Sequence, residues 1–124
     1  MRDMLADSLS ALLRDHVDAR ALEAIDRGEW PARLWAALED NGFTCALGPE
    51  RLGGASWEGA FVIAHLAMKA PAPAPLTDTM MANWLMGACG VDPASGSVVL
   101  AFDHTLALTS NKASGLVNAA PWGA

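Results

Sequence analysis

The sequence predicts a mainly α-helical domain that is followed by an incomplete antiparallel β segment. Three observations lead to this prediction. Apolar side chains recur at helical spacing over most of residues 1–92, helix-ending and turn-forming residues divide that stretch into about four main helices, and short β-rich runs replace the helical pattern after Asp92-Pro93. We therefore expect a helical domain over residues 1–92 and the beginning of a β-domain over residues 93–124.

The first helix is predicted by a stripe of side chains that recurs at i, i+4, i+7, i+8 and i+11, the pattern of one face of an amphipathic helix. Its members are Leu5, Leu9, Leu12, Leu13 and His16. A short helix is expected next over residues 19–26. Leu22 and Ile25 are spaced to share a face there, and Gly28 can end the helix.

The next helix has a recognisable start and stop. Pro31 suits the first helical position, where its missing N–H costs nothing. The side chains predicted to share the buried face are Leu34, Trp35 and Leu38. Asn41-Gly42 is expected to end the helix, because Gly42 can adopt the left-handed conformation that closes a helix C-terminus.

A further helix is predicted over residues 56–70, with Ser56 as its N-cap and the Glu58 carboxylate in its first turn. Apolar side chains surround it on nearly all sides, so we expect it to be buried. They are Phe61, Val62, Ile63, Leu66, Ala67 and Met68. His65 is interpreted as a hydrogen-bonded core histidine in preference to a catalytic base.

The last helix is expected after a stiff connector that contains Pro71, Pro73 and Pro75. Thr77 or Asp78 can cap it, and Gly90 ends it. The predicted apolar face consists of Met80, Met81, Trp84, Leu85 and Ala88.

The β segment is predicted from three short runs, Ser97–Phe102, Thr105–Thr109 and Leu116–Ala120. So few strands cannot close a sheet. We therefore expect an open apolar edge that self-associates or binds a partner.

The order of these signals resembles the N-terminal helical domain of the acyl-CoA dehydrogenase family. A W-x-x-L-x-x-x-G-F segment from Trp35 to Phe43 leads into P-E-x-x-G-G. The residues of that second motif are Pro49, Glu50, Gly53 and Gly54. A Gly-rich loop before a helix could also cradle a phosphate. It lacks the Lys-Ser/Thr pair of a P-loop, however, so a structural turn is the favoured interpretation.

The resemblance implies a flavin-dependent enzyme that uses FAD for α,β-desaturation of acyl-CoA thioesters, such as those of fatty acids or steroid side chains. This segment would wall one side of the acyl pocket and help to cover the flavin. In the family the catalytic base comes from a C-terminal helical domain that these 124 residues do not contain. We therefore identify no catalytic residue here, and we expect the chain alone to be inactive and to act within a homo- or hetero-oligomer.

The resemblance also suggests a flavin contact near the C-terminus. Gly115 matches a family glycine at the start of a strand, and Ala119 and Pro121 occupy the two positions that lie against the flavin ring, with Trp122 beside them. The family usually has Trp and Thr at those positions, and its acidic motif T-E-P-x-x-G-S-D is missing here. An ordinary role at a strand end is therefore the alternative. For the whole chain, the alternatives are a non-catalytic helical partner subunit and a truncated fragment without independent activity.

Composition excludes several other classes. The net charge of −6, without a cluster of Lys and Arg, argues against nucleic-acid binding. Cys45 and Cys89 have no metal-ligand spacing, so we expect two buried thiols and no metal site. Charges in the first 16 residues rule out a secretory signal, and no apolar run is long enough to span a membrane. A cytoplasmic protein is expected.

The tryptophans at positions 30, 35, 57 and 84 are interpreted first as core or interface residues and second as ligand contacts. The six methionines could line a flexible acyl pocket, although filling gaps in the core explains them equally well.

Overall fold

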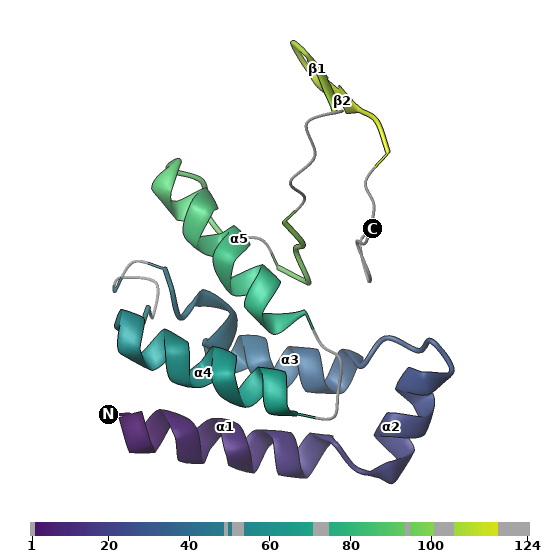
Figure 1. The fold of residues 1–124 in the computed structure, drawn as a ribbon, viewed down its shortest axis with the longest axis vertical. Helices are drawn as coiled ribbons and strands as arrows, with labels where there is room; N and C mark the ends of the chain where they lie inside the picture. The colour runs from purple at the N-terminus through teal and green to yellow at the C-terminus, as the bar shows by residue number, and fades with distance from the viewer. Residues whose placement is uncertain are drawn as a thin grey trace.

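Figure 1 shows the computed structural model, which describes residues 2–48, 50, 54–70, 75–93, 95–100 and 106–116. Helices dominate these ranges, and a short antiparallel hairpin follows them, which confirms the predicted fold class. The elements are α1 (Arg2–His16), α2 (Ala19–Asp26), α3 (Ala32–Asp40), the 3-10 turn η1 (Phe43–Cys45), α4 (Trp57–Lys69), α5 (Leu76–Ala88), β1 (Ala107–Thr109) and β2 (Lys112–Ser114).

The core lies where α1, α3, α4 and the start of α5 meet around η1. Leu9, Leu38 and Ile63 are among its most deeply buried side chains. The stripe predicted for the first helix contributes Leu9 and Leu12 to this core, and the predicted face of α3 is buried through Leu34, Trp35 and Leu38. The other buried apolar residues of the cluster are Ile25, Phe43, Ala46, Ala60, Leu76 and Met80.

Helices α1 and α4 lie side by side (Figure 1), and Gly59 is a point of close approach. A Cβ atom at Gly59 would lie 2.9 Å from Leu5 Cδ1 and 3.1 Å from Ala55 Cβ. Because real Cβ contacts are longer, a side chain at this position would require the end of the Leu5 side chain and Ala55 to shift. The missing side chain thus leaves room for Leu5 of α1 against α4.

Local capping signals define several helix ends; the Ser56 cap and the stop at Asn41-Gly42 are as predicted, whereas the Asp18 cap was not predicted. Asp18 caps α2 by accepting a hydrogen bond from Ala21 N at 2.8 Å, and Ser56 caps α4 by accepting one from Gly59 N at 3.1 Å. Asn41 is the C-cap of α3 and Gly42 follows with a φ of 75°.

Two predicted helix starts are wrong, by one residue for α3 and by two or three residues for α5. Pro31 is the N-cap of α3, not its first helical residue, and Pro75 takes the same place before α5, ahead of Thr77 and Asp78. Neither proline offers a side-chain capping bond. The exact first residue of a helix is the hardest part to predict, because neighbouring start positions differ only in the conformation of the first turn.

Helix α4 is not buried on all sides, contrary to the prediction. Ala60 and Ile63 face the core, whereas Trp57, Phe61 and Met68 remain 71%, 66% and 71% exposed. Packing against α1 and α5 covers one side of α4, and no described residue covers the other. His65 lies on this outer side, so the prediction of a core histidine is also wrong; its ring stacks on Phe61, with 6.1 Å between the ring centroids.

Helix α5 buries a different face from the one predicted. Of the expected apolar face only Met80 is buried, while Met81, Trp84, Leu85 and Ala88 are exposed. The inward positions include the polar residues Thr79 and Asn83. Both have backbone hydrogen-bond partners inside the fold. These bonds turn the Thr79–Asn83 side of α5 inward, whereas the apolar periodicity predicted a different inward side.

The two strands pair antiparallel, with Leu108 opposite Ala113 and a turn at Ser110-Asn111. All six strand residues are exposed. The predicted run Ser97–Phe102 is not a strand over its described residues 97–100. Side chains form hydrogen bonds with the backbone within this run and directly before it. Glu39 Oε1 accepts a hydrogen bond from Gly96 N at 2.6 Å, and the Thr79 hydroxyl binds Val98.

Several predictions fall outside the described residues. They concern Pro49, Gly53, the connector prolines 71 and 73, and the strand run after Leu116. The prediction of two buried thiols is wrong for Cys89, which is exposed because it follows the last turn of α5, and Cys45 is half-buried.

Candidate functional site

An apolar groove lies between α4 and α5, with a volume of about 200 Å³, and it reaches from exposed side chains down to the buried residues Ala60 and Met80. Thr77 is the one polar residue among the groove's described lining residues. The groove is lined by Leu47, Trp57, Ala60, Phe61, Ala64, Thr77, Met80 and Met81. A surface of this composition excludes ordered water from its floor and favours a hydrocarbon ligand or another protein surface.

The wall formed by α5 is held in place by two buried polar side chains on its inner side. Thr79, which is 0% exposed, donates its hydroxyl hydrogen to Val98 O at 2.9 Å and accepts a hydrogen bond from Val98 N at 3.1 Å. One hydroxyl therefore satisfies both backbone groups of Val98, as a neighbouring strand would. This arrangement turns Met81 and Trp84 outward.

Asn83 provides the second anchor and is 1% exposed. Its Nδ2 donates to Thr44 O at 2.9 Å and lies 3.9 Å from Cys45 Sγ. Its Oδ1 has no partner among the described residues. The amide joins α5 to η1, so the position of the groove depends on a hydrogen bond between distant parts of the chain.

Aromatic contacts complete one end of the groove. The rings of Trp57 on α4 and Trp84 on α5 meet edge to face, with centroids 6.2 Å apart. In contrast, Trp30 and Trp35 pack against each other at 5.3 Å, away from the groove lining. The interpretation of the tryptophans as core or interface residues therefore holds for Trp35, which is buried in the core, and for Trp30, which packs against it, whereas Trp57 lines the groove.

The residues predicted to contact flavin, Ala119, Pro121 and Trp122, lie outside the described residues. Gly115 is described and follows β2 with a φ of 149°. The groove itself does not fit a flavin, because its volume is below the roughly 300 Å³ of the smallest typical ligand pockets and its described lining offers few partners for polar ring atoms.

The carboxylates near the resembled motif do not form a catalytic arrangement in the described structure. Glu50 and Asp78 are both exposed, and Asp78 lies in the first turn of α5. No group of three or more potential metal ligands gathers within the described ranges.

A larger hollow of about 510 Å³ opens at the other side of the molecule, between the end of α1 and the starts of α2 and α3. Charges of both signs line it, including Asp15, Asp18, Arg20, Glu29 and Arg33. Glu29 accepts a hydrogen bond from Arg27 and Asp18 caps α2, so part of this lining already has structural roles. The mixed signs favour no single class of charged ligand.

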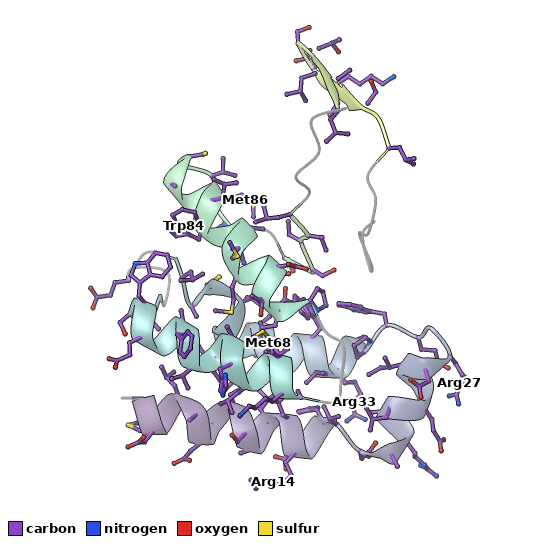
Figure 2. All side chains as sticks on the ribbon, in the orientation of Figure 1. Arg14, Arg27, Arg33, Met68, Trp84 and Met86 are labelled. Atoms are coloured by element: carbon purple, nitrogen blue, oxygen red, sulfur yellow. The ribbon has the colours of Figure 1, made fainter. Side chains whose placement is uncertain are left out.

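Figure 2 shows Arg14 and Arg27 on the side of the molecule away from Trp84. Both side chains are exposed. No arginine is among the groove's described lining residues, so Arg14 and Arg27 give it no positive rim for the phosphates of a coenzyme. In the described part of the chain, no helix has the length and apolar character needed to cross a membrane.

The methionines and tryptophans are predicted from the sequence as possible pocket residues, but no sequence pattern predicts that they lie together. The positions that form the groove's α4 wall, Trp57, Phe61 and Ala64, follow each other at spacings of four and three residues. On α4 this spacing marks an apolar stripe in addition to the one that faces the core, and it is the sequence signal that could have located the groove.

Comparison with known proteins supports the resemblance inferred from the motifs. The family model for the acyl-CoA dehydrogenase N-terminal domain matches residues 2–92. No curated protein and no solved structure matches the chain significantly. The match spans α1 to α5 and includes both walls of the groove. The chain therefore belongs to the acyl-CoA dehydrogenase family, and the match to the family's N-terminal domain covers residues 2–92.

Proposed function

We propose that the chain is part of a flavin-dependent acyl-CoA dehydrogenase and that its α4–α5 groove forms one wall of the pocket for the acyl chain. The observation that carries this proposal is the apolar groove between Trp57, Phe61 and Met81, in a chain that belongs to this family. The substrate would be an acyl-CoA thioester, and the reaction would be α,β-desaturation.

The size of the groove fits one wall of an acyl-chain pocket better than it fits a complete pocket. Its volume of about 200 Å³ accommodates a segment of hydrocarbon chain but not a whole acyl-CoA. Each methylene buried there would contribute about 0.8 kcal/mol to binding. Met80 and Met81 can adjust to chains of different shape, because thioether side chains are flexible and polarizable.

The flavin part of the proposal rests on the sequence resemblance. Ala119, Pro121 and Trp122 are proposed to contact FAD, and a structural role at a strand end is the alternative for them. The groove's described lining residues include no carboxylate or histidine that could serve as a base. The proposed role of the groove is therefore to bind the acyl chain and to exclude water from it, while the reacting thioester lies elsewhere.

The acyl-wall proposal can be tested by contact quenching with an acyl-CoA that carries bromine along its acyl chain. We expect the bromine to quench tryptophan fluorescence, because Trp57 lines the groove and Trp84 contacts Trp57. Trp57→Phe combined with Trp84→Phe should remove most of the quenching. Trp30→Phe is the matched control, since Trp30 packs on Trp35 away from the groove.

A second pair of variants tests the location of the binding site. Met81→Asp places a carboxylate in the groove and should weaken acyl-CoA binding. Leu85→Asp, one turn further along α5 and outside the groove lining, should change binding little. Unbrominated acyl-CoA and free coenzyme A serve as ligand controls. Equal quenching in the parent and in the double tryptophan variant would contradict the proposal.

A further inference from the structure

The sulfur of Cys45 lies among polar groups from two separate elements. Thr44 Oγ1, on the preceding residue of η1, is 3.9 Å from Sγ, and Asn83 Nδ2 on α5 is also 3.9 Å from Sγ. Thr44 is 5% exposed and Asn83 is 1% exposed, whereas Cys45 itself is half-buried. Small solutes can therefore reach the sulfur, while its polar neighbours are shielded from water.

The side-chain amide of Asn83 has one unfilled hydrogen-bonding position in this cluster. Its Nδ2 carries two hydrogens, and its two acceptors are Thr44 O at 2.9 Å and Cys45 Sγ. Because Thr44 O can only accept, it fixes which atom of the amide is the nitrogen. Asn83 Oδ1 then has no partner among the described residues.

The unpartnered oxygen lies close to the sulfur. Asn83 Oδ1 and Nδ2 are bonded to the same carbon and are about 2 Å apart, and Nδ2 contacts Cys45 Sγ. A buried acceptor without a donor is unfavourable, so this position calls for a donor that the reduced thiol does not supply.

We propose that Cys45 is a site of reversible oxidation by hydroperoxides, and that the sulfenic acid formed there donates its hydrogen to Asn83 Oδ1. The added oxygen extends the Cys45 side chain by one bond. Its O–H group is also a stronger donor than the S–H group of a thiol. Oxidation thus supplies the missing partner of the buried amide.

Hydrogen peroxide is the smallest oxidant of this class. The Cys45 thiolate forms a bond from sulfur to one peroxide oxygen while the O–O bond breaks. Sulfur loses two electrons, and the other oxygen departs as hydroxide and takes up a proton to become water. A small thiol can reverse the change: it condenses with the sulfenic acid to a disulfide and water, and a second thiol then releases Cys45.

Cys89 provides a comparison within the same chain. It is exposed at the C-cap of α5, and within the described residues no hydrogen bond involves its sulfur. A sulfenic acid at Cys89 would be open to water and to further oxidation. Exposure alone therefore predicts more reaction at Cys89, whereas the contacts of Asn83 predict that the sulfenic acid accumulates at Cys45. The proposal is independent of the acyl chain, because Cys45 is not among the described lining residues of the groove.

A peroxide pulse on the full chain tests the proposal, with catalase to remove the excess. Unfolding the protein in dimedone then traps every sulfenic acid, whatever its exposure in the fold. Peptide mass spectrometry should show about fivefold more adduct at Cys45 than at Cys89, the ratio that one hydrogen bond of ordinary strength gives. Equal adducts, an excess at Cys89, or a disulfide between the two cysteines would overturn the proposal.

Alkylation of the untreated folded chain with iodoacetamide is the control for exposure, and it should favour Cys89. The same preference for Cys45 in alkylation would assign the difference to general reactivity and contradict the role of Asn83. Dithiothreitol added after the pulse should restore the Cys45 thiol. Sulfinic acid as the main product at Cys45 would exclude a reversible site.

Two variants test the acceptor. Asn83→Leu removes Oδ1 and should lower the Cys45 adduct to the level at Cys89. Asn41→Leu is the matched control, because it removes an exposed amide that bonds to Ala37 O, and it should keep the parent ratio. Circular dichroism shows whether each variant is folded, and the comparison of the two cysteines in the parent chain requires no variant. An undiminished Cys45 adduct in folded Asn83→Leu would overturn the proposal.

Discussion

Asn83 Nδ2 donates a hydrogen bond to the carbonyl oxygen of Thr44 at 2.9 Å, across 39 residues of sequence and inside the core. Both residues are buried. Water cannot replace the bond when it is lost, so it contributes more than a surface bond of the same length. The bond joins α5 to η1 and thereby fixes the groove wall that carries Met81 and Trp84.

Replacing Asn83 by leucine should lower the free energy of unfolding by about 1–3 kcal/mol, because Thr44 O would stay buried without a donor. Denaturant unfolding of variant and parent measures the difference. Asn41→Leu is a matched control. Its Nδ2 also donates to a backbone oxygen, Ala37 O, at 2.8 Å, but the site is exposed and water can substitute. Equal effects of the two substitutions would contradict the role of burial.

The variant Asn83→Asp should make stability depend on pH. Burial disfavours the charged form, so the pKa of the introduced carboxyl rises in the folded state above its unfolded value of about 4. Below that value the carboxyl is neutral in both states and can donate to Thr44 O. As pH increases, the unfolded state loses the proton first, and stability falls until the pH exceeds the raised folded pKa. Thermal melts from acid to neutral pH, expressed as variant minus parent, measure this slope, and a difference that is constant with pH would refute it.

Thr79→Val should loosen the segment that contains Val98 from α5. Valine keeps the shape of threonine but removes both hydrogen bonds to Val98, at a cost of about 1–3 kcal/mol in unfolding free energy. Hydrogen exchange of the peptide that spans residues 95–100 should be faster. Thr79→Ser retains the hydroxyl and should exchange close to the parent rate. Unchanged exchange in Thr79→Val would mean that the two bonds do not hold this segment.

Gly59→Leu should displace the side chain of Leu5 on α1 and crowd Ala55, and should lower stability by about 1–3 kcal/mol through overpacking. The reason is the contact of 3.1 Å that even a Cβ would make with Ala55 Cβ, together with Leu5 Cδ1 on the facing helix. The midpoint of thermal unfolding measures the effect. Val62→Leu, at a half-buried position of the same helix, adds a methylene without this clash and should change the midpoint little. A stabilised Gly59→Leu variant would show that the helices yield easily.

The chain purified with excess FAD is expected to hold no stoichiometric flavin. The α4–α5 groove is too small and too apolar for the ring, and the family's acidic motif is missing from residues 98–109. The visible absorption spectrum of the desalted protein provides the measurement. A yellow complex at one flavin per chain would contradict this prediction and would direct attention to residues 117–124.

The sequence determined where most helices begin and end. Ser56 and Asp18 cap α4 and α2 with bonds to residues three positions away, and Gly42 ends α3 with a positive φ. Such signals act within one turn of the chain, so they need no tertiary partner. The amphipathic faces of α1 and α3 were also predictable, because each helix has one clearly apolar side that can only face inward.

The tertiary structure alone decided which faces of α4 and α5 are covered. Helix α4 is apolar nearly all round, so the periodicity of Phe61 and Met68 gives no direction, whereas the spacing in α5 predicted a face of which only Met80 is buried. Buried polar groups supplied the direction, because Thr79 and Asn83 have backbone partners only on the inner side. The local sequence likewise did not decide whether residues 97–100 form a strand. The backbone N–H and C=O of Val98 bind the Thr79 side chain, and residues 97–100 form no strand. The groove exists because long-range hydrogen bonds, which no local pattern encodes, left apolar side chains facing outward.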